Sequence, residues 1–179
     1  KQLCDLDWMQ LDLLGAVTRY DFPPAELVIE RAQGAQAVLI NKVKMTAQLM
    51  DALPDMKYIG VLATGYDNVD LAAAKQRGIV VTNVPKYSTD SVAQLIFALL
   101  LELCHHAGAH SADVIENKAW SRQPYYSYWN SPLIELAGKT MGIVGMGAIG
   151  QKTAQIARAF GMKVLAYSRT KKAVDGVEW

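Results

Sequence analysis

The feature that most constrains this chain is a glycine pattern between an apolar run and a helical segment. Residues 145–150 read Gly-Met-Gly-Ala-Ile-Gly, a GxGxxG motif. Residues 140–144 before it predict a buried strand, residues 151–160 a helix, and residues 163–167 a second strand. Such a turn brings the backbone close to a pyrophosphate at a helix N-terminus, where N–H groups lack intrahelical acceptors. The motif predicts a dinucleotide site formed by Gly145, Met146, Gly147, Ala148, Ile149 and Gly150.

The loop after the second strand indicates which dinucleotide is bound. NAD sites usually place an Asp or Glu about 20 residues past the glycines, on the ribose 2′-hydroxyl. This loop instead contains Ser168, Arg169, Thr170 and Lys171, followed by Lys172. A hydroxyl and three cations attract a 2′-phosphate, which a carboxylate would repel. We therefore expect these residues to favour NADP(H) over NAD(H); the alternative is that the cations are only solvated.

The composition is that of a soluble globular protein. The chain is 51% hydrophobic and 20% charged with a net charge of +1, which gives no bias toward nucleic acid or acidic partners. The most apolar stretch, Val92–Cys104, contains Gln94 and Glu102 and is shorter than the about 20 residues of a membrane span, so it predicts a buried helix. Cys4 and Cys104 form neither a disulfide framework nor a metal pattern, and no signal or transit segment is visible, so we expect a cytoplasmic protein without a metal site.

Strand-like runs alternate with helical segments, which predicts an α/β fold with parallel sheets. The expected strands are 16–20, 37–40, 58–62, 79–82, 140–144 and 163–167. The expected helices are 6–14, 23–33, 46–53, 70–77, a long helix from Ser91, and 151–160. The long helix is apolar nearly all round, which suggests burial between domains or between subunits. A boundary near residues 84–90 separates two domains, residues 1–88 and 89–179.

Aromatic residues are concentrated in one irregular segment. Residues 117–132 contain Trp120, Tyr125, Tyr126, Tyr128 and Trp129. Rigid amphipathic rings anchor interfaces well, so this segment predicts subunit packing, with a substrate cleft as the alternative.

Several longer motifs resemble one enzyme family. Residues 60–74, Gly-Val-Leu-Ala-Thr-Gly-Tyr-Asp-Asn-Val-Asp-Leu-Ala-Ala-Ala, and residues 78–85, Gly-Ile-Val-Val-Thr-Asn-Val-Pro, resemble the substrate-domain signature of the D-isomer-specific 2-hydroxyacid dehydrogenases. Residues 87–95 and 136–150 resemble the linking helix and cofactor turn of that family, closest to its hydroxypyruvate reductase or glycerate dehydrogenase type. Gln94 stands where the family usually has Glu, and Ser168 where it usually has Asp.

The resemblance implies a fold and an activity. Residues 1–88 would form a flavodoxin-like substrate domain without its first strand, and residues 89–179 the linking helix and first βαβ unit of a Rossmann domain. The chain would then be truncated at both ends and inactive alone, with strand edges exposed. The complete parent would be an NAD(P)H-dependent enzyme that reduces a 2-oxo acid, hydroxypyruvate or glyoxylate, to the D-2-hydroxy acid, as a homodimer formed through residues 91–132.

The resemblance also implies where substrate binds. Backbone N–H groups around Thr64 and Gly65 would receive the substrate carboxylate at the end of a strand, where open α/β sheets bind ligands. Lys42 follows another strand and would add a positive charge, or is an exposed loop lysine. Asp67 and Asn68 are expected to fix the turn, since Asx side chains commonly bond nearby backbone.

No catalytic residue is assigned within the chain. The Arg, Glu and His that the family uses would lie beyond Trp179. His105, His106 and His110 lie at or just past the end of the long helix, where an imidazolium faces the negative end of the helix dipole. Two alternatives stay open: a dehydrogenase of the same fold for phosphoglycerate, D-lactate or formate, or a non-catalytic module that senses a dinucleotide.

Overall fold

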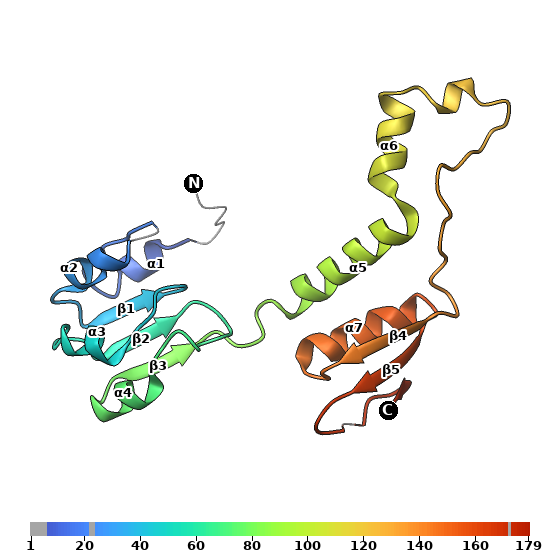
Figure 1. The fold of residues 1–179 in the computed structure, drawn as a ribbon. Coiled ribbons are helices and arrows are strands. Elements are labelled where there is room, and N and C mark those ends of the chain that lie inside the picture. The colour runs from blue at the N-terminus through green and yellow to red at the C-terminus, as the bar shows by residue number, and fades with distance from the viewer. Residues whose placement is uncertain (1–6, 22–23, 172) are drawn as a thin grey trace. The chain divides into compact units, whose positions relative to one another are not determined.

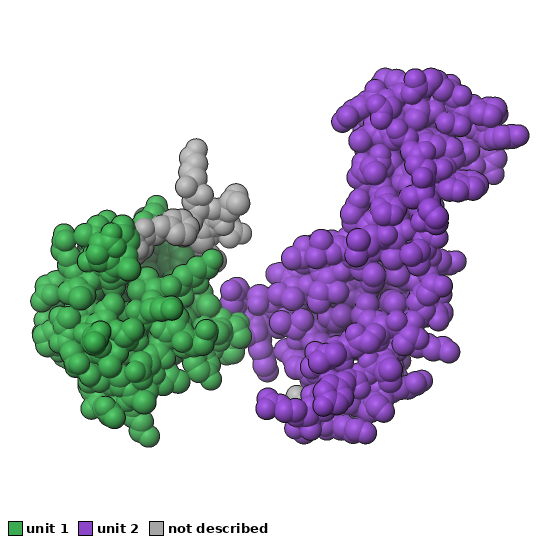
Figure 2. All heavy atoms as spheres, in the orientation of Figure 1, with its two compact units in different colours: residues 1–85 green, residues 86–179 purple. Residues whose placement is uncertain are grey.

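A computed structural model describes residues 7–21, 24–171 and 173–179 of the chain. It divides into two compact units, Lys1–Pro85 and Lys86–Trp179, coloured separately in Figure 2. Within the described residues each unit contains a three-stranded sheet, and all strand pairs are parallel (Figure 1). The expected α/β fold with two parallel sheets is confirmed. The functional division into residues 1–88 and 89–179 stays a prediction.

The sheet of the first unit has the order β1-β2-β3. Its strands are β1 (Ala37–Ile40), β2 (Tyr58–Val61) and β3 (Val80–Asn83), each within one residue of its predicted range. Because the three strands are parallel, their carboxyl ends meet at one edge of the sheet, and the loops that follow them lie together there.

The core of the first unit lies on one face of this sheet. Ile59 and Val61 of β2 are 0% and 1% exposed, since alternate strand residues point to the same face. They belong to one buried cluster with residues of α3 (Ala47–Asp51) and α4 (Leu71–Gln76). Thr46 and Asp70 cap these two helices through their side-chain oxygens, as the sequence predicted for Thr46.

The predicted strand at residues 16–20 is wrong. This segment is exposed and has no regular secondary structure; it pairs with no strand among the described residues, and a strand needs a ladder partner. Arg19 holds the segment instead through an ion pair with Asp12 at 2.6 Å. The helices on either side are α1 (Met9–Asp12), η1 (Ala25–Leu27) and α2 (Val28–Ala32), which are shorter than predicted.

The sheet of the second unit has the order β4-β5-β6 and one crossover helix between its first two strands. The elements are β4 (Thr140–Val144), α7 (Ala148–Ala159), β5 (Lys163–Tyr167) and β6 (Val177–Glu178). The predictions of β4 and β5 are confirmed. The helix α7 begins at Ala148 rather than Gln151, so the last three residues of the glycine motif form its first turn. The strand β6 was not predicted, because two residues carry no alternating pattern.

The long apolar helix is interrupted and only partly buried. It forms α5 (Thr89–His105) and α6 (Ala107–Ile115), which meet at His106 in a left-handed conformation. Residues Ala93, Phe97 and Cys104 of α5 are buried. Leu95, Leu99 and Leu103, spaced four apart, are 58%, 59% and 70% exposed. No described element of the unit covers this face, so its expected burial between domains or between subunits stays a prediction.

The described residues contain no single helix with the length and apolar composition to cross a membrane. The helices α5 and α6 meet that test only together, as a pair bent by 57°.

The aromatic segment 117–132 is irregular apart from η2 (Trp120–Arg122), as predicted. One carboxylate ties it to α6: Asp113 accepts hydrogen bonds from Asn117 at 3.0 Å, from Asn130, and from Tyr128 at 3.4 Å. These bonds, that from Asn117 first, lower the pKa of the Asp113 carboxyl below its usual value of 3.8. Tyr125, Tyr126 and Trp129 are 76%, 90% and 68% exposed, so the tethered segment presents aromatic rings to solvent.

Candidate functional site

The glycine turn lies at the carboxyl edge of the second sheet. Gly145 has φ +99°, a conformation that L side chains rarely adopt. Its N–H donates to the carbonyl oxygen of Tyr167, the last residue of β5, at 2.7 Å. The turn is thereby fixed to the start of the loop that contains Ser168 and Arg169.

Gly150 allows α7 to pack directly on the turn. A Cβ on Gly150 would overlap the carbonyl oxygen of Gly145 and would stand 3.4 Å from Ile143 of β4. Gly150 is itself buried. The close approach of helix and strand that the motif predicted therefore depends on the absence of a side chain at this position.

The start of α7 fits an anionic group. Gly147 is the N-cap, and a Cβ built on it would have no other atom within 4 Å, so its surroundings are open. The first intrahelical hydrogen bond joins Gln151 N–H to Gly147 O at 3.0 Å. Among the residues that the structure describes, the N–H groups of Ala148, Ile149 and Gly150 have no acceptor. Open space, unpaired donors and the positive end of the helix dipole suit a pyrophosphate.

The remaining residue of the motif contributes differently. Met146 is 1% exposed, and its side chain belongs to the hydrophobic core of the second unit. Its carbonyl oxygen accepts a hydrogen bond from the Gln151 side chain at 3.1 Å. Met146 can therefore offer a ligand only its backbone N–H.

The loop after β5 presents its polar groups to solvent. Ser168 is half-buried, whereas Arg169, Thr170 and Lys171 are exposed. In residues 7–21, 24–171 and 173–179, neither Arg169 nor Lys171 forms an ion pair. Both cations remain available to an anion beside the glycine turn. Lys172 lies outside the described residues.

A second candidate site lies at the carboxyl edge of the first sheet. Thr64 and Gly65 follow β2 and are exposed. The Thr64 hydroxyl donates to Val84 O at 3.1 Å, and the Asn83 amide donates to Thr64 O at 2.8 Å. Two hydrogen bonds thus join Thr64 to the end of β3, one through its hydroxyl and one through its carbonyl oxygen. Asn83 was not expected at this site, although a polar residue that ends a strand beside a candidate site was a usable signal.

Lys42 lies in the neighbouring loop at this same edge, after β1. It is exposed, which is compatible both with a role in binding the substrate carboxylate and with an ordinary loop lysine. Asn68 donates through Nδ2 to Asn41 O at 3.0 Å and to Val43 O at 2.8 Å. Asn68 bonds to backbone as predicted, but across to the adjacent loop rather than within its own turn.

The three histidines lie at or near the junction of α5 and α6, where they take part in local contacts. His106 is the shared cap residue, and His110 Nδ1 lies 3.1 Å from the carbonyl oxygens of both His105 and His106. Within the described part of the chain, no group of three His, Cys, Asp or Glu side chains is arranged to hold a metal ion.

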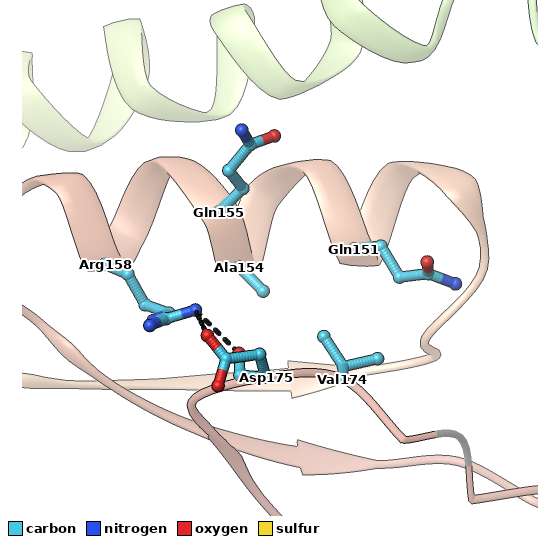
Figure 3. Close-up of a pocket in the computed structure, with 6 residues that line it drawn as sticks. All are labelled: Gln151, Ala154, Gln155, Arg158, Val174 and Asp175. Atoms are coloured by element: carbon cyan, nitrogen blue, oxygen red, sulfur yellow. Dashed lines mark hydrogen bonds and ion pairs between the residues drawn. The ribbon is translucent and has the colours of Figure 1, made fainter.

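A hollow of about 330 Å³ lies beside α7 (Figure 3). None of the described residues that line it belongs to the glycine motif. Its lining residues are Gln151, Ala154, Gln155, Arg158, Val174 and Asp175. Arg158 pairs with the Asp175 carboxylate at 3.0 Å and donates to the Asp175 carbonyl at 2.7 Å (Figure 3). Among the described residues that line this hollow, the charged side chains are Arg158 and Asp175, and they neutralise one another.

Two parallel sheets with polar loops at their carboxyl edges, one with a glycine turn at a helix N-terminus, define an α/β protein of the dinucleotide-binding class. Residues 4–177 match the profile of the family described as "D-isomer specific 2-hydroxyacid dehydrogenase, catalytic domain". The chain belongs to this family, which confirms the resemblance seen in the sequence.

Among curated relatives, the chain is 49% identical over 170 residues to a hydroxypyruvate reductase from Blautia hydrogenotrophica. The match covers 93% of this chain and 52% of that protein. The chain thus spans about half the length of the curated relatives it matches.

Solved structures show the same fold. An acyclic imino acid reductase, Bsp5, in complex with NADPH and D-Arg superposes with a TM-score of 0.78 at 30% identity, over 99% of this chain and 57% of that one. A D-lactate dehydrogenase from Aquifex aeolicus, complexed with NAD and lactic acid, superposes with a TM-score of 0.67 at 31% identity, over 80% of this chain and 42% of that one. Structures of this fold therefore hold either nicotinamide dinucleotide.

Proposed function

We propose that the whole protein, the complete gene product that contains these residues, uses NADPH to reduce hydroxypyruvate or glyoxylate to the D-2-hydroxy acid. The observation that carries this proposal is the glycine turn at the N-terminus of α7, with its unpaired N–H groups and open surroundings at Gly147. The substrate class follows from the similarity to a hydroxypyruvate reductase.

The cofactor preference rests on the loop after β5. When bound, the nicotinamide dinucleotide supplies the hydride that reduces the carbonyl carbon. The N–H groups of Ala148, Ile149 and Gly150 hold its pyrophosphate. Ser168 and Thr170 donate hydrogen bonds to a 2′-phosphate, and Arg169 and Lys171 neutralise its charge, so NADPH is favoured over NADH.

The substrate carboxylate binds at the edge of the first sheet. Backbone N–H groups at Thr64 and Gly65 donate hydrogen bonds to it, and the Lys42 ammonium balances its charge. The hydrogen bonds of Thr64 to Val84 and Asn83 keep this segment in place before substrate arrives. No described residue is assigned to protonate the new alkoxide, so the 179 residues alone are expected to turn over no substrate.

We also propose a cytoplasmic homodimer formed through residues 91–132. The exposed leucines of α5 and the exposed rings of Tyr125, Tyr126 and Trp129 provide an apolar, aromatic surface of the kind that interfaces bury. Sedimentation of the whole protein should give twice the mass of one chain, and a monomer would contradict the proposal.

The experiment that tests the activity is a substrate panel with the purified whole protein. NADPH oxidation is followed with hydroxypyruvate, glyoxylate, pyruvate and phosphohydroxypyruvate, and NAD⁺ reduction with formate, each repeated with the other nicotinamide. We expect the highest kcat/KM for hydroxypyruvate or glyoxylate with NADPH. Dinucleotide-dependent self-association without turnover of any substrate would favour a sensing module and contradict the proposal.

A further inference from the structure

One side-chain amide joins two loops at the carboxyl edge of the first sheet. Asn68, in the loop after β2, donates to Asn41 O at 3.0 Å and to Val43 O at 2.8 Å. These two carbonyls flank Lys42 in the chain. A single amide NH₂ has two hydrogens, and both are used to fix the backbone on either side of one lysine.

Backbone hydrogen bonds join the same two loops on both sides of this contact. Leu62 N–H donates to Ile40 O at 2.7 Å, where the strands end. Met45 N–H donates to Asn68 O at 2.8 Å, and Met45 is 2% exposed, so the far end of the loop is anchored in the core. The loops form a frame that is closed at both ends, and Asn68 holds the part between them that contains Lys42.

The frame places a cation and a candidate anion site on one sheet edge. Lys42 is exposed and forms no ion pair in the described part of the chain. Thr64 and Gly65 belong to the same β2 loop as Asn68. A lysine is a point charge on a flexible stem, so the place its ammonium can reach depends on how firmly its backbone is held.

Resting on the proposed function, we propose that Asn68 is a positioning residue for the 2-oxo acid. It acts through Lys42, by holding that lysine on the frame so that its ammonium and the N–H groups at Thr64 and Gly65 meet one carboxylate. Asn68 has no side-chain N–H left to donate to the substrate carboxylate, because both of its amide hydrogens are bonded to backbone carbonyls.

A double-mutant cycle in the whole protein tests this inference. Asn68→Ala, Lys42→Ala and the double variant are compared for the KM of glyoxylate, the KM of NADPH and kcat. We expect each single variant to raise the glyoxylate KM about tenfold, the size of one hydrogen bond lost. The NADPH KM should stay unchanged, and the double variant should be no worse than Lys42→Ala, because Asn68 has nothing left to position.

Additive effects in the double variant, or a rise in the NADPH KM of similar size, would overturn the inference and leave the proposed function standing. A wild-type protein that reduces no 2-oxo acid would overturn the proposed function, and the inference with it. If Asn68→Ala does not fold, Asn68→Asp takes its place: it has the same size, its carboxylate cannot donate to Asn41 O or Val43 O, and the same lack of additivity with Lys42→Ala is expected.

Discussion

The carboxyl edges of the two sheets are built by opposite means. At the edge of the first sheet, side chains add connections to the backbone hydrogen bonds: Asn68, Asn83 and Thr64 donate to backbone carbonyls of neighbouring segments. At the edge of the second sheet, the connection depends on the absence of side chains. Gly145 adopts a positive φ, and Gly150 lets the start of α7 pack against the Gly145 carbonyl. The loops of the first edge are joined by side-chain hydrogen bonds, whereas the second edge has open space at Gly147 and N–H groups without acceptors.

This difference suits the two ligands that we propose. A small carboxylate needs a few donors at fixed positions, and tethered loops provide them. A pyrophosphate is large and needs close access to backbone, which glycine gives. Different mutations should therefore impair the two edges. Removal of a hydrogen-bond donor should weaken carboxylate binding at the first edge, and addition of a Cβ should weaken dinucleotide binding at the second.

The largest effect is expected from a pair of glycine variants that separates packing from binding. A Cβ in Gly150→Ala would overlap the Gly145 carbonyl, which should cost about 1–3 kcal/mol of stability or more and abolish NADPH binding. A Cβ in Gly147→Ala meets no atom within 4 Å and its φ of −74° suits alanine, so the fold should persist while the Kd for NADPH rises. Urea unfolding and NADPH titration of both variants provide the measurement. Equal stability of the two proteins would show that the turn and helix are not packed as described.

A charge reversal at the open edge tests the cofactor preference. Arg169→Asp removes a cation and adds a carboxylate that can bond to a ribose 2′-hydroxyl. Loss of one charge-assisted hydrogen bond is worth about 1.5–3 kcal/mol, so the KM for NADPH should rise roughly tenfold to a hundredfold while that for NADH falls. Arg158→Asp reverses the same charge near the end of α7 and also removes the ion pair with Asp175, so it serves as the control for the ratio of the two KM values only. An unchanged ratio of the two KM values would remove the 2′-phosphate assignment.

A smaller effect is expected from a near-isosteric change at the tied edge. Thr64→Val removes the hydroxyl that donates to Val84 O at 3.1 Å and should cost about 1 kcal/mol of stability. The glyoxylate KM should rise several-fold with the NADPH KM unaffected. Thr82→Val, in β3, where the hydroxyl contacts Tyr58 instead, serves as the control for loss of a threonine hydroxyl. Equal effects of both variants on the glyoxylate KM would mean that the tie between Thr64 and Val84 does not serve substrate binding.

The smallest effect concerns a third kind of tether, the Asp113 carboxylate that holds the aromatic segment. Its pKa is lowered in the folded protein by hydrogen bonds from Asn117 and Asn130, so its contribution to stability is present above the unfolded pKa of about 3.8 and is lost as the pH falls through the lower folded pKa. Asn117, Asn130, Tyr128 and His110 are the groups that influence it.

An acid titration followed by near-UV circular dichroism measures this tether. The wild-type aromatic signal should weaken as the pH falls below about 3.8, and Asp113→Asn should give a signal without that step. A step of the same size in both proteins would show that the segment is held by other contacts.

The sequence predicted what depends on local pattern. Apolar runs predicted the strands β1 to β5, Thr46 predicted the start of α3, and the glycine motif predicted the contact between turn and helix. These features depend on residues close together in the chain, so hydrophobic period and capping chemistry were sufficient.

Interactions between residues distant in the chain could not be predicted in this way. Residues 16–20 have the pattern of a strand, but no described strand pairs with them. The break at His106 places a non-glycine residue at positive φ, which the apolar pattern gave no reason to expect. The bonds of Asn68 reach residues 25 and 27 positions away, and no short motif encodes such partners.

The most direct test of the account measures two KM values in two variants of the whole protein. If the edges form separate subsites, Asn68→Ala should raise the KM for glyoxylate and leave that for NADPH unchanged. Gly147→Ala should do the reverse. The account is contradicted if both variants raise the same KM, or if each raises both equally, because the two edges would then not divide substrate and dinucleotide between them.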